Sequence, residues 1–317
     1  MLPVTPAVIQ LAFDPVVRLG DQGVRVETML IGLTLLAALV LAVRIARVTP
    51  VDLARPAAAP APSSDGANHL RADDLLYLAI AVLPGAVVGG RLGYALNHLD
   101  YYSANPGAVV DPAQGGLALT LAVVGGTVTA GVVARLLDAP IRRWLHASTL
   151  PLLFALGTGK LALVLGGDGQ GVPTDVPWAT AYAGFGPWGS LAPEVPSHPA
   201  QAYEAILVLA VTVLVGALLA GGGFARRDGR VFLLAVGMWA TVRFGVAFTW
   251  RDPHVLGPLR VEQLVSLGLA ASMLGLLVVR TMRERARRSA DDHGAGLQSD
   301  GDTNGVVWPD PDVRPRF

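Results

Sequence analysis

Residues 202–221 read AYEAILVLAVTVLVGALLAG, a stretch with one acidic side chain and no basic one. A helix rises about 1.5 Å per residue, so a stretch of this length spans a bilayer core that is about 30 Å thick. Six further apolar blocks lie along the chain, at 28–47, 75–97, 116–137, 149–166, 230–249 and 260–280. The sequence therefore predicts an all-α integral membrane protein with seven transmembrane helices.

The composition excludes a soluble globular protein. The chain has 317 residues and zero formal net charge, and 15% of its residues are charged while 52% are hydrophobic. Soluble domains contain about 25% charged residues, so this chain has too little polar surface for a water-exposed fold. Cysteine is absent, which excludes disulfides, thiolate metal sites and a cysteine nucleophile supplied by the protein. We expect no metal ion, no cofactor and no nucleic-acid partner.

Arginine residues alternate between successive loops and so predict the orientation. The loops 98–115 and 167–201 contain no lysine or arginine. The loops on the other side are rich in arginine, which occurs there as Arg44, Arg47, Arg55, Arg71, Arg135, Arg142, Arg143, Arg226, Arg227 and Arg230. Because cytoplasmic loops carry the excess of basic residues, the N-terminus is predicted to lie outside and the C-terminus in the cytoplasm.

The chain is predicted to contain one folded membrane domain, residues 28–280. A short extracytoplasmic segment, 1–27, precedes it. Residues 48–73 are rich in Pro, Ala and Ser and predict a flexible cytoplasmic linker. Residues 281–317 are polar, rich in Asp and Gly and without apolar periodicity, which predicts a disordered cytoplasmic tail.

Three basic residues lie inside the apolar blocks: Arg91, Lys160 and Arg243. A cation in mid-helix costs roughly 2.5–3.5 kcal/mol, so each needs a partner or a watery cavity. With the predicted orientation, each lies about six residues, or on the order of 9 Å, below the outer boundary. Polar side chains flank the spans on that same side, namely Asp168, His198, Gln201, Tyr203, Glu204, Glu262, Gln263 and Ser266.

Two interpretations of these cations remain open. Each one alone could extend its side chain to the membrane interface. Together, at one depth and beside carboxylates, they predict a polar cavity that opens to the outer leaflet. A lipid headgroup phosphate suits such a cavity, because arginine binds phosphate through two parallel hydrogen bonds.

Two short motifs lie at this outer side. Gly89-Gly90-Arg91-Leu92-Gly93-Tyr94 ends the second span, where glycines allow a neighbouring helix or a ligand to approach the backbone. Ser197-His198-Pro199-Ala200-Gln201-Ala202-Tyr203-Glu204 begins the fifth span, since proline is favoured at the start of a helix. Helix packing alone explains the first motif but does not require the second.

Both motifs resemble the prolipoprotein diacylglyceryl transferase family, which carries Gly-x-Arg-Leu-Gly-Tyr and Arg-His-Pro-Ser-Gln-Leu-Tyr-Glu. Further similarity, in chain order, lies in Phe13-Asp14-Pro15, in Arg243-Phe244 of the sixth span and in Glu262-Gln263-Leu264-Val265-Ser266 at the start of the seventh. The resemblance covers about residues 13–280.

The resemblance implies a multi-pass enzyme of the bacterial plasma membrane that acts at the outer leaflet. Members transfer a diacylglyceryl group from phosphatidylglycerol to the lipobox cysteine of prolipoproteins. The implied partners are phosphatidylglycerol, lipoprotein signal peptides and membrane lipids. The implied catalytic residues are Arg243, Arg91, Lys160, His198 and Glu204. The implied substrate-binding residues are Tyr94, Asp168, Gln201, Tyr203, Gly125, Gly126 and Gln263.

The chain departs from the family pattern at several positions. In the fourth span Lys160 replaces arginine, Leu163 and Gly166 replace asparagines, and Asp168 replaces glutamate. Elsewhere, Val124 replaces a histidine, Glu27 a tyrosine and Ala247 a glutamate. Two alternatives therefore stay open: a catalytically impaired paralogue that binds phospholipid or signal peptide, and an unrelated transporter or receptor. The general base is likewise left open between His198 and Glu204.

Overall fold

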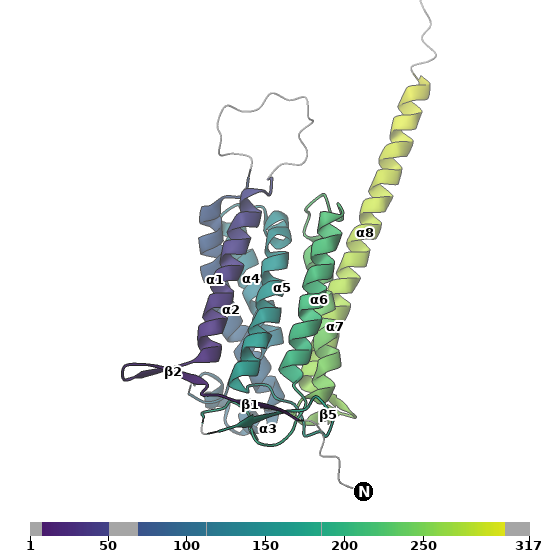
Figure 1. The fold of residues 1–317 in the computed structure, drawn as a ribbon. Coiled ribbons are helices and arrows are strands. Elements are labelled where there is room, and N and C mark those ends of the chain that lie inside the picture. Colours follow the sequence, from purple (N-terminus) through teal and green to yellow (C-terminus); the bar gives the residue numbers. More distant parts are fainter. Residues whose placement is uncertain (1–7, 51–68, 112, 185, 302–317) are drawn as a thin grey trace, which may run out of the picture. The chain divides into compact units, whose positions relative to one another are not determined.

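The computed structural model of the chain describes residues 8–50, 69–111, 113–184 and 186–301. The chain divides into two units, Met1–Leu274 and Gly275–Phe317. The first unit contains the helix bundle, the short strands and every contact discussed below (Figure 1). Most of the predicted linker, residues 51–68, lies outside the described residues.

Long helices dominate the described part of the chain. Seven of them are long and apolar enough to cross a membrane, and they are α1 (Val26–Arg47), α2 (Ala72–Asn97), α4 (Leu119–Leu136), α5 (Ile141–Gly166), α6 (Ala200–Ala220), α7 (Arg230–Val246) and α8 (Val261–Gly301). The predicted fold class of seven apolar helices is confirmed, and the protein is a multi-pass membrane protein.

Two helices are longer than the apolar blocks predicted. α5 begins at Ile141, eight residues before the predicted span, because its first turns find protein partners. There the Trp144 ring is buried, and the Arg143 guanidinium donates hydrogen bonds to the backbone carbonyls of Arg226 and Arg227. α8 continues to Gly301 through a segment rich in good helix formers, whereas the sequence predicted a disordered tail from residue 281. Residues 302–317 lie outside the described residues.

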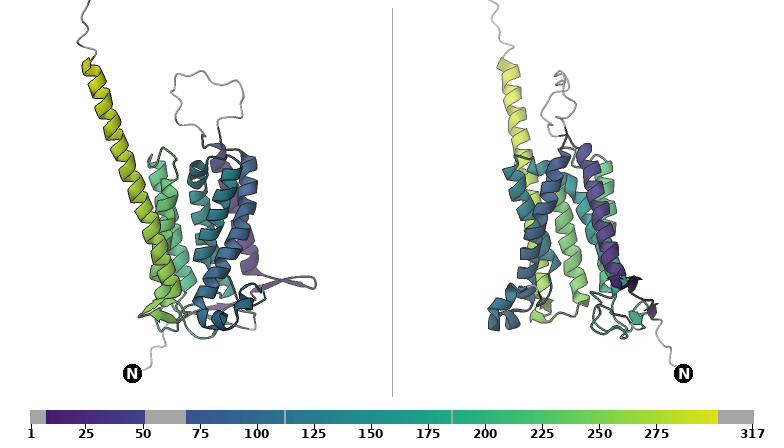
Figure 2. Two further views of the ribbon diagram at one scale, coloured as in Figure 1. Left: turned by 180° about the vertical axis from the view of Figure 1, so that it is seen from behind. Right: turned by 90° about the vertical axis from the view of Figure 1, so that its left-hand side faces the viewer.

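Glycines bring α2 and α4 into close contact, and the two helices lie side by side (Figure 2). A Cβ atom added to Gly125 would lie 2.1 Å from the carbonyl oxygen of Gly85. One added to Gly89 would lie 2.1 Å from the carbonyl oxygen of Leu121. The two backbones therefore touch along this seam, as small residues allow in membrane helices.

The described residues form six short strands, which lie at one end of the bundle (Figure 1). β1 (Ile9–Ala12) pairs in parallel with β4 (Thr180–Ala183), and the other strands form two antiparallel pairs, β2 (Val16–Leu19) with β3 (Gln22–Arg25) and β5 (His254–Leu256) with β6 (Leu259–Arg260). We call this end the strand end. α2 and α5 finish there, while α6 and α8 begin there, and it also carries the short helices α3 (Leu99–Ala104), η1 (Pro106–Val109) and η2 (Ala247–Thr249).

Candidate functional site

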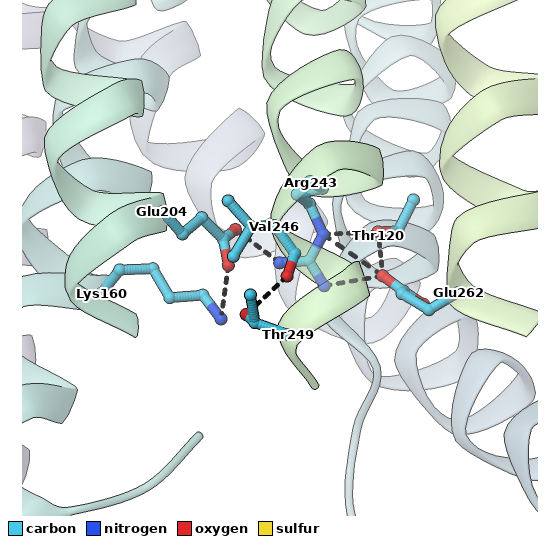
Figure 3. Close-up of polar contacts among 7 residues, drawn as sticks. All are labelled: Thr120, Lys160, Glu204, Arg243, Val246, Thr249 and Glu262. Carbon is cyan, nitrogen blue, oxygen red and sulfur yellow. Dashed lines mark hydrogen bonds and ion pairs between the residues drawn. The ribbon is translucent and has the colours of Figure 1, made fainter. Parts of the chain in front are cut away.

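A buried arginine on α7 forms the centre of a polar cluster near the strand end (Figure 3). Arg243 is 3% exposed. Its Nη1 donates to Oε1 of Glu204 at 2.6 Å, and its Nη2 donates to Oε1 of Glu262 at 2.6 Å. Its Nε donates to the hydroxyl of Thr120 at 2.9 Å. Arg243 on α7 is thus held by side chains from three other helices, α4, α6 and α8.

Glu204 also binds the second cation of the cluster. Its Oε2 lies 3.0 Å from Nζ of Lys160, which comes from α5. The four charged groups, Lys160, Glu204, Arg243 and Glu262, alternate in sign and sum to zero. The Trp250 ring faces both cations, with its centroid 4.8 Å from Cζ of Arg243 and 5.7 Å from Nζ of Lys160. Such alternation offsets part of the cost of burying four charges.

The direction of the helices explains why these groups meet. Arg243 lies in the last turn of α7, where a positive charge is favoured by the helix dipole, and Lys160 lies six residues before the end of α5. Glu262 lies in the first turn of α8, where a negative charge is favoured, and Glu204 is the fifth residue of α6. Since α5 and α7 finish at the end where α6 and α8 begin, the chain collects opposite charges at one level.

A polar cavity of about 480 Å³ opens beside this cluster. Its lining includes Lys160, Arg243, Glu262, Tyr94, Asn97, His98, Gln170, Gln201, Ser190, Trp250, Arg251 and Asp252. Cavities of this size accommodate small-molecule ligands.

A second cavity, of about 540 Å³, is almost wholly apolar. Its walls come from α1, α2, α4, α5 and α7, with side chains that include Ile31, Leu35, Leu75, Leu78, Val82, Val123, Leu145, Leu152, Leu156 and Phe232. Lys160 and Leu119 line both cavities. One ammonium group thus lies where a polar chamber and an apolar chamber share a wall.

Comparison with known proteins assigns the chain to a protein family. A family model described as prolipoprotein diacylglyceryl transferase matches residues 16–279. The chain belongs to this family. The resemblance inferred from the motifs is confirmed.

Individual relatives agree with this assignment. The phosphatidylglycerol–prolipoprotein diacylglyceryl transferase of Geobacter sulfurreducens is 32% identical over 218 residues, which cover 65% of this chain and 79% of the relative. The protein of the same name from Methylocella silvestris is 32% identical over 225 residues, covering 67% and 76%. That from Polynucleobacter necessarius subsp. necessarius is 31% identical over 242 residues, covering 72% and 84%.

Within this diacylglyceryl transferase fold, Arg91 does not join Lys160 and Arg243. Its guanidinium donates to the backbone carbonyls of Ala108, Val109 and Asp111 at 2.6–2.8 Å. It also lies 5.5 Å from the ring centroid of Tyr102. Arg91 therefore fastens the segment after α3 to the end of α2, while its neighbour Tyr94 lines the polar cavity.

Gln201 is buried, lines the polar cavity and is held by a hydrogen-bond chain that leads away from it. Its Nε2 donates to the hydroxyl of Tyr182 at 3.0 Å, and that hydroxyl donates to the carbonyl oxygen of Val164 at 2.8 Å. Burial raises the pKa of Tyr182 to about 12. Asp168 instead pairs with Arg25 at 3.4 Å and is half-exposed at the side chain.

The remaining predicted residues lie in other settings. His198 contacts the Tyr203 hydroxyl through Nδ1 at 3.2 Å, and Trp178 donates to the same hydroxyl at 2.6 Å. Gln263 accepts from the backbone N–H of Arg260 at 2.9 Å and so caps the start of α8. The two predicted glycines of α4 pack against α2, Gly125 beside Gly85 and Gly126 beside Val82.

Sequence reasoning left four residues of the site out of its predicted set. Glu262 is predicted as a polar residue on the same side as the cations but not as a partner of Arg243. Thr120 and Trp250 gave no signal, because a threonine in an apolar span and a tryptophan near an interface are both common. His98 follows the second span directly and lines the polar cavity. Within the described residues, no group of three or more His, Cys, Asp or Glu side chains is placed to hold a metal ion.

Proposed function

We propose that this protein transfers a diacylglyceryl group from phosphatidylglycerol to the lipobox cysteine of prolipoproteins. The observation that carries the proposal is the position of Lys160, which lines both the polar and the apolar cavity and is paired to Arg243 through Glu204. A phospholipid is the ligand class with an anionic group directly joined to long apolar chains. Curated relatives named for this activity support the same assignment.

Each of the two cavities holds a different part of the lipid. The phosphate and its glycerol headgroup occupy the polar cavity beside Lys160, and the acyl chains extend into the apolar cavity along α2, α4 and α5. Burying apolar chain contributes about 0.8 kcal/mol per CH₂ group, although the chains are already shielded in the bilayer. The apolar cavity therefore orients the lipid more than it adds affinity.

The cations stabilise the charge that moves to the phosphate. The cysteine sulfur attacks the glyceryl carbon that bears the phosphate ester, a carbon–sulfur bond forms, and the carbon–oxygen bond breaks. Its electron pair goes to the phosphate oxygen, so glycerol phosphate leaves and a thioether remains. Fixed cations beside the leaving oxygen lower this barrier, an effect worth about 10²–10³ in rate for a single donor.

Both cations keep hydrogen-bond donors for this task. Arginine has five N–H groups, and the contacts of Arg243 with described residues engage one on each of its three nitrogens, which leaves two. Lys160 has three N–H groups and binds one carboxylate oxygen. A phosphodiester can therefore bind without dismantling the cluster.

The orientation in the membrane follows from the arginine distribution. The strand end, with the cluster and the polar cavity, faces the outer leaflet of the bacterial plasma membrane, and the opposite end faces the cytoplasm. The arginines at that opposite end lie in the last or first turns of helices or between them, namely Arg44, Arg47, Arg135, Arg142, Arg143, Arg226, Arg227 and Arg230. In this proposed orientation the reaction takes place where a prolipoprotein presents its signal peptide after export.

A reconstituted assay tests the proposal directly. The purified full chain in detergent, phosphatidylglycerol and a synthetic peptide with a lipobox cysteine should give a diacylglyceryl-modified peptide and an equal amount of glycerol phosphate. A peptide with serine in place of the cysteine is the matched control and should remain unmodified. Wild-type protein that yields neither product contradicts the proposal.

A second candidate is a non-catalytic relative that binds phospholipid or signal peptide. The substitutions Val124, Leu163 and Gly166, at positions where the family pattern has polar side chains, favour it. The same assay separates the two functions: binding of phosphatidylglycerol without turnover supports the second candidate.

A further inference from the structure

A histidine that no motif singles out lines the polar cavity. His98 lies between the last residue of α2 and the first residue of α3 and is exposed. Among the described residues that line this cavity it is the only histidine, and it shares the lining with Lys160 and Arg243. The fold thus places an imidazole in the same chamber as the two cations.

The contacts of His98 fix which ring nitrogen can accept a proton. Nδ1 lies 2.9 Å from the carbonyl oxygen of Tyr94, which can only accept a hydrogen bond. Nδ1 therefore carries the hydrogen, and Nε2 of the neutral ring carries the lone pair. The ring also stacks on the Tyr94 ring, with centroids 4.2 Å apart, so its orientation is held from two sides.

The position of His98 suits a group that becomes positively charged. Its Nδ1–H binds one of the last carbonyl groups of α2, which has no partner of its own inside the helix. The carbonyl end of a helix favours a cation. A proton taken up at Nε2 therefore creates a charge at the end of α2 that suits it.

The two glutamates of the cluster and His198 are already engaged. Glu204 binds both Lys160 and Arg243, and Glu262 binds Arg243 and Thr120. His198 contacts Tyr203 through Nδ1 and does not occur among the described lining residues. Asp252 also lines the chamber, but among the described contacts only its backbone carbonyl is held, whereas the His98 ring is fixed by a hydrogen bond and by stacking. Among the described residues of the lining, His98 is therefore the base whose ring is held in place without an ion pair to Lys160 or Arg243.

We propose that His98 is the general base of the transfer reaction. This rests on the function proposed above. Nε2 takes the proton of the substrate cysteine thiol as the sulfur forms its bond to the glyceryl carbon and the carbon–oxygen bond of the phosphate ester breaks. Glycerol phosphate leaves with the electron pair, and the imidazolium then releases its proton to the departing phosphate or to water. The reaction needs no reactant other than the peptide thiol and the phospholipid.

Substitution of His98, with chemical rescue, tests the proposal. In full-length protein, His98→Ala should lower turnover by about 10²–10⁴-fold, the usual contribution of a general base. Binding of phosphatidylglycerol should stay within about twofold of wild type. Added imidazole should restore part of the lost turnover. The matched control is His254→Ala, which removes an exposed histidine from β5 at the same end of the bundle and should keep wild-type turnover.

The substrate offers a second readout that a structural defect would not alter. A free cysteine thiol ionises near a pKa of about 8.5, so at higher pH the peptide supplies its own thiolate. The turnover ratio of wild type to His98→Ala should therefore shrink as pH rises through that value. The other charged groups of the chamber, present in both proteins, are Lys160, Arg243, Arg251, Asp252 and Glu262.

The outcomes are distinct for the two proposals. Wild-type turnover in His98→Ala overturns the role of His98 and leaves the transferase function intact. A loss of turnover that imidazole and high pH do not reduce, with weaker lipid binding, assigns His98 to structure and likewise overturns the proposal. Absence of turnover in the wild-type protein overturns the transferase function and, with it, this base.

Discussion

A single carboxylate oxygen of Glu262 accepts hydrogen bonds from both Nε and Nη2 of Arg243, at 3.2 and 2.6 Å. This contact fixes one edge of the guanidinium and leaves its remaining N–H groups for other partners. Glu262→Gln keeps an oxygen acceptor but removes a negative charge from the chamber. We expect phosphatidylglycerol to bind about fivefold more tightly, roughly 1 kcal/mol at an effective dielectric near 20 after screening. Equilibrium binding of the lipid measures this, and unchanged affinity contradicts it.

Glu262→Ala should behave differently, because it leaves one edge of a buried guanidinium without a partner. Breaking a buried ion pair costs about 3–5 kcal/mol, so the variant should unfold at clearly lower temperature than Glu262→Gln. Thermal unfolding in the same detergent compares the two. Equal stability of both variants would show that the pair is not structurally important.

Lys160 gives the next prediction, through its place at the wall between the two cavities. Lys160→Met keeps most of the apolar side chain but removes the charge beside the phosphate, so turnover should fall by about 10²–10³-fold. Lys160→Arg keeps the charge and adds a planar fork that binds phosphate in two places, so turnover should be retained and lipid binding strengthened. Parallel assays of both variants measure this, and full turnover in Lys160→Met contradicts it.

Substitutions of Arg91 and Arg243 should affect different kinetic constants. Arg91 binds three backbone carbonyls through its planar fork, and a lysine can replace only part of that set. Arg91→Lys should therefore loosen the segment after α3 beside the chamber and raise KM, with kcat nearly unchanged. Arg243→Ala should lower kcat by about 10²-fold or more. A larger fall of kcat in Arg91→Lys than in Arg243→Ala would contradict this prediction.

The seam between α2 and α4 predicts a change in stability rather than in chemistry. Gly125→Ala places a methyl group 2.1 Å from the Gly85 carbonyl oxygen, so the two helices must separate. Gly216→Ala on α6 is the matched control, since no atom lies within 4 Å of its added Cβ. We expect loss of folded protein on size exclusion for Gly125→Ala and none for Gly216→Ala. Similar profiles for the two variants would refute the close packing.

The seven helices could be predicted because the thickness of a bilayer fixes the length of an apolar block. The start of α5 could not, since it depends on tertiary partners. The sequence indicates no partner for the Arg143 side chain. In the fold its guanidinium donates hydrogen bonds to the backbone carbonyls of Arg226 and Arg227. Helix ends are set by such contacts, which hydropathy does not encode.

The depth of each site residue along its helix could be predicted from the sequence, but the direction in which its side chain points could not. Lys160 and Arg243 were predicted at one depth, with Glu204 among the polar residues on the same side, and the fold joins the three. Arg91 has a similar depth, yet its side chain faces the segment after α3, because depth along a helix does not say which way a side chain points. His98 escaped notice for a related reason: only the fold shows that the end of α2 borders the polar cavity.

Tyr182 provides a prediction about pH. Burial raises the pKa of its hydroxyl from the ordinary value of 10.0 to about 12, so the folded protein favours the neutral form. Its contribution to stability is therefore fully present below pH 10 and is lost as pH rises through about 12, because the unfolded chain releases the proton first. Tyr182→Phe removes this group together with the acceptor of the Gln201 amide. Stability should then fall less steeply above pH 10 than in wild type, as chemical unfolding across that range measures, and parallel curves for the two proteins would rule out the buried hydroxyl as the cause.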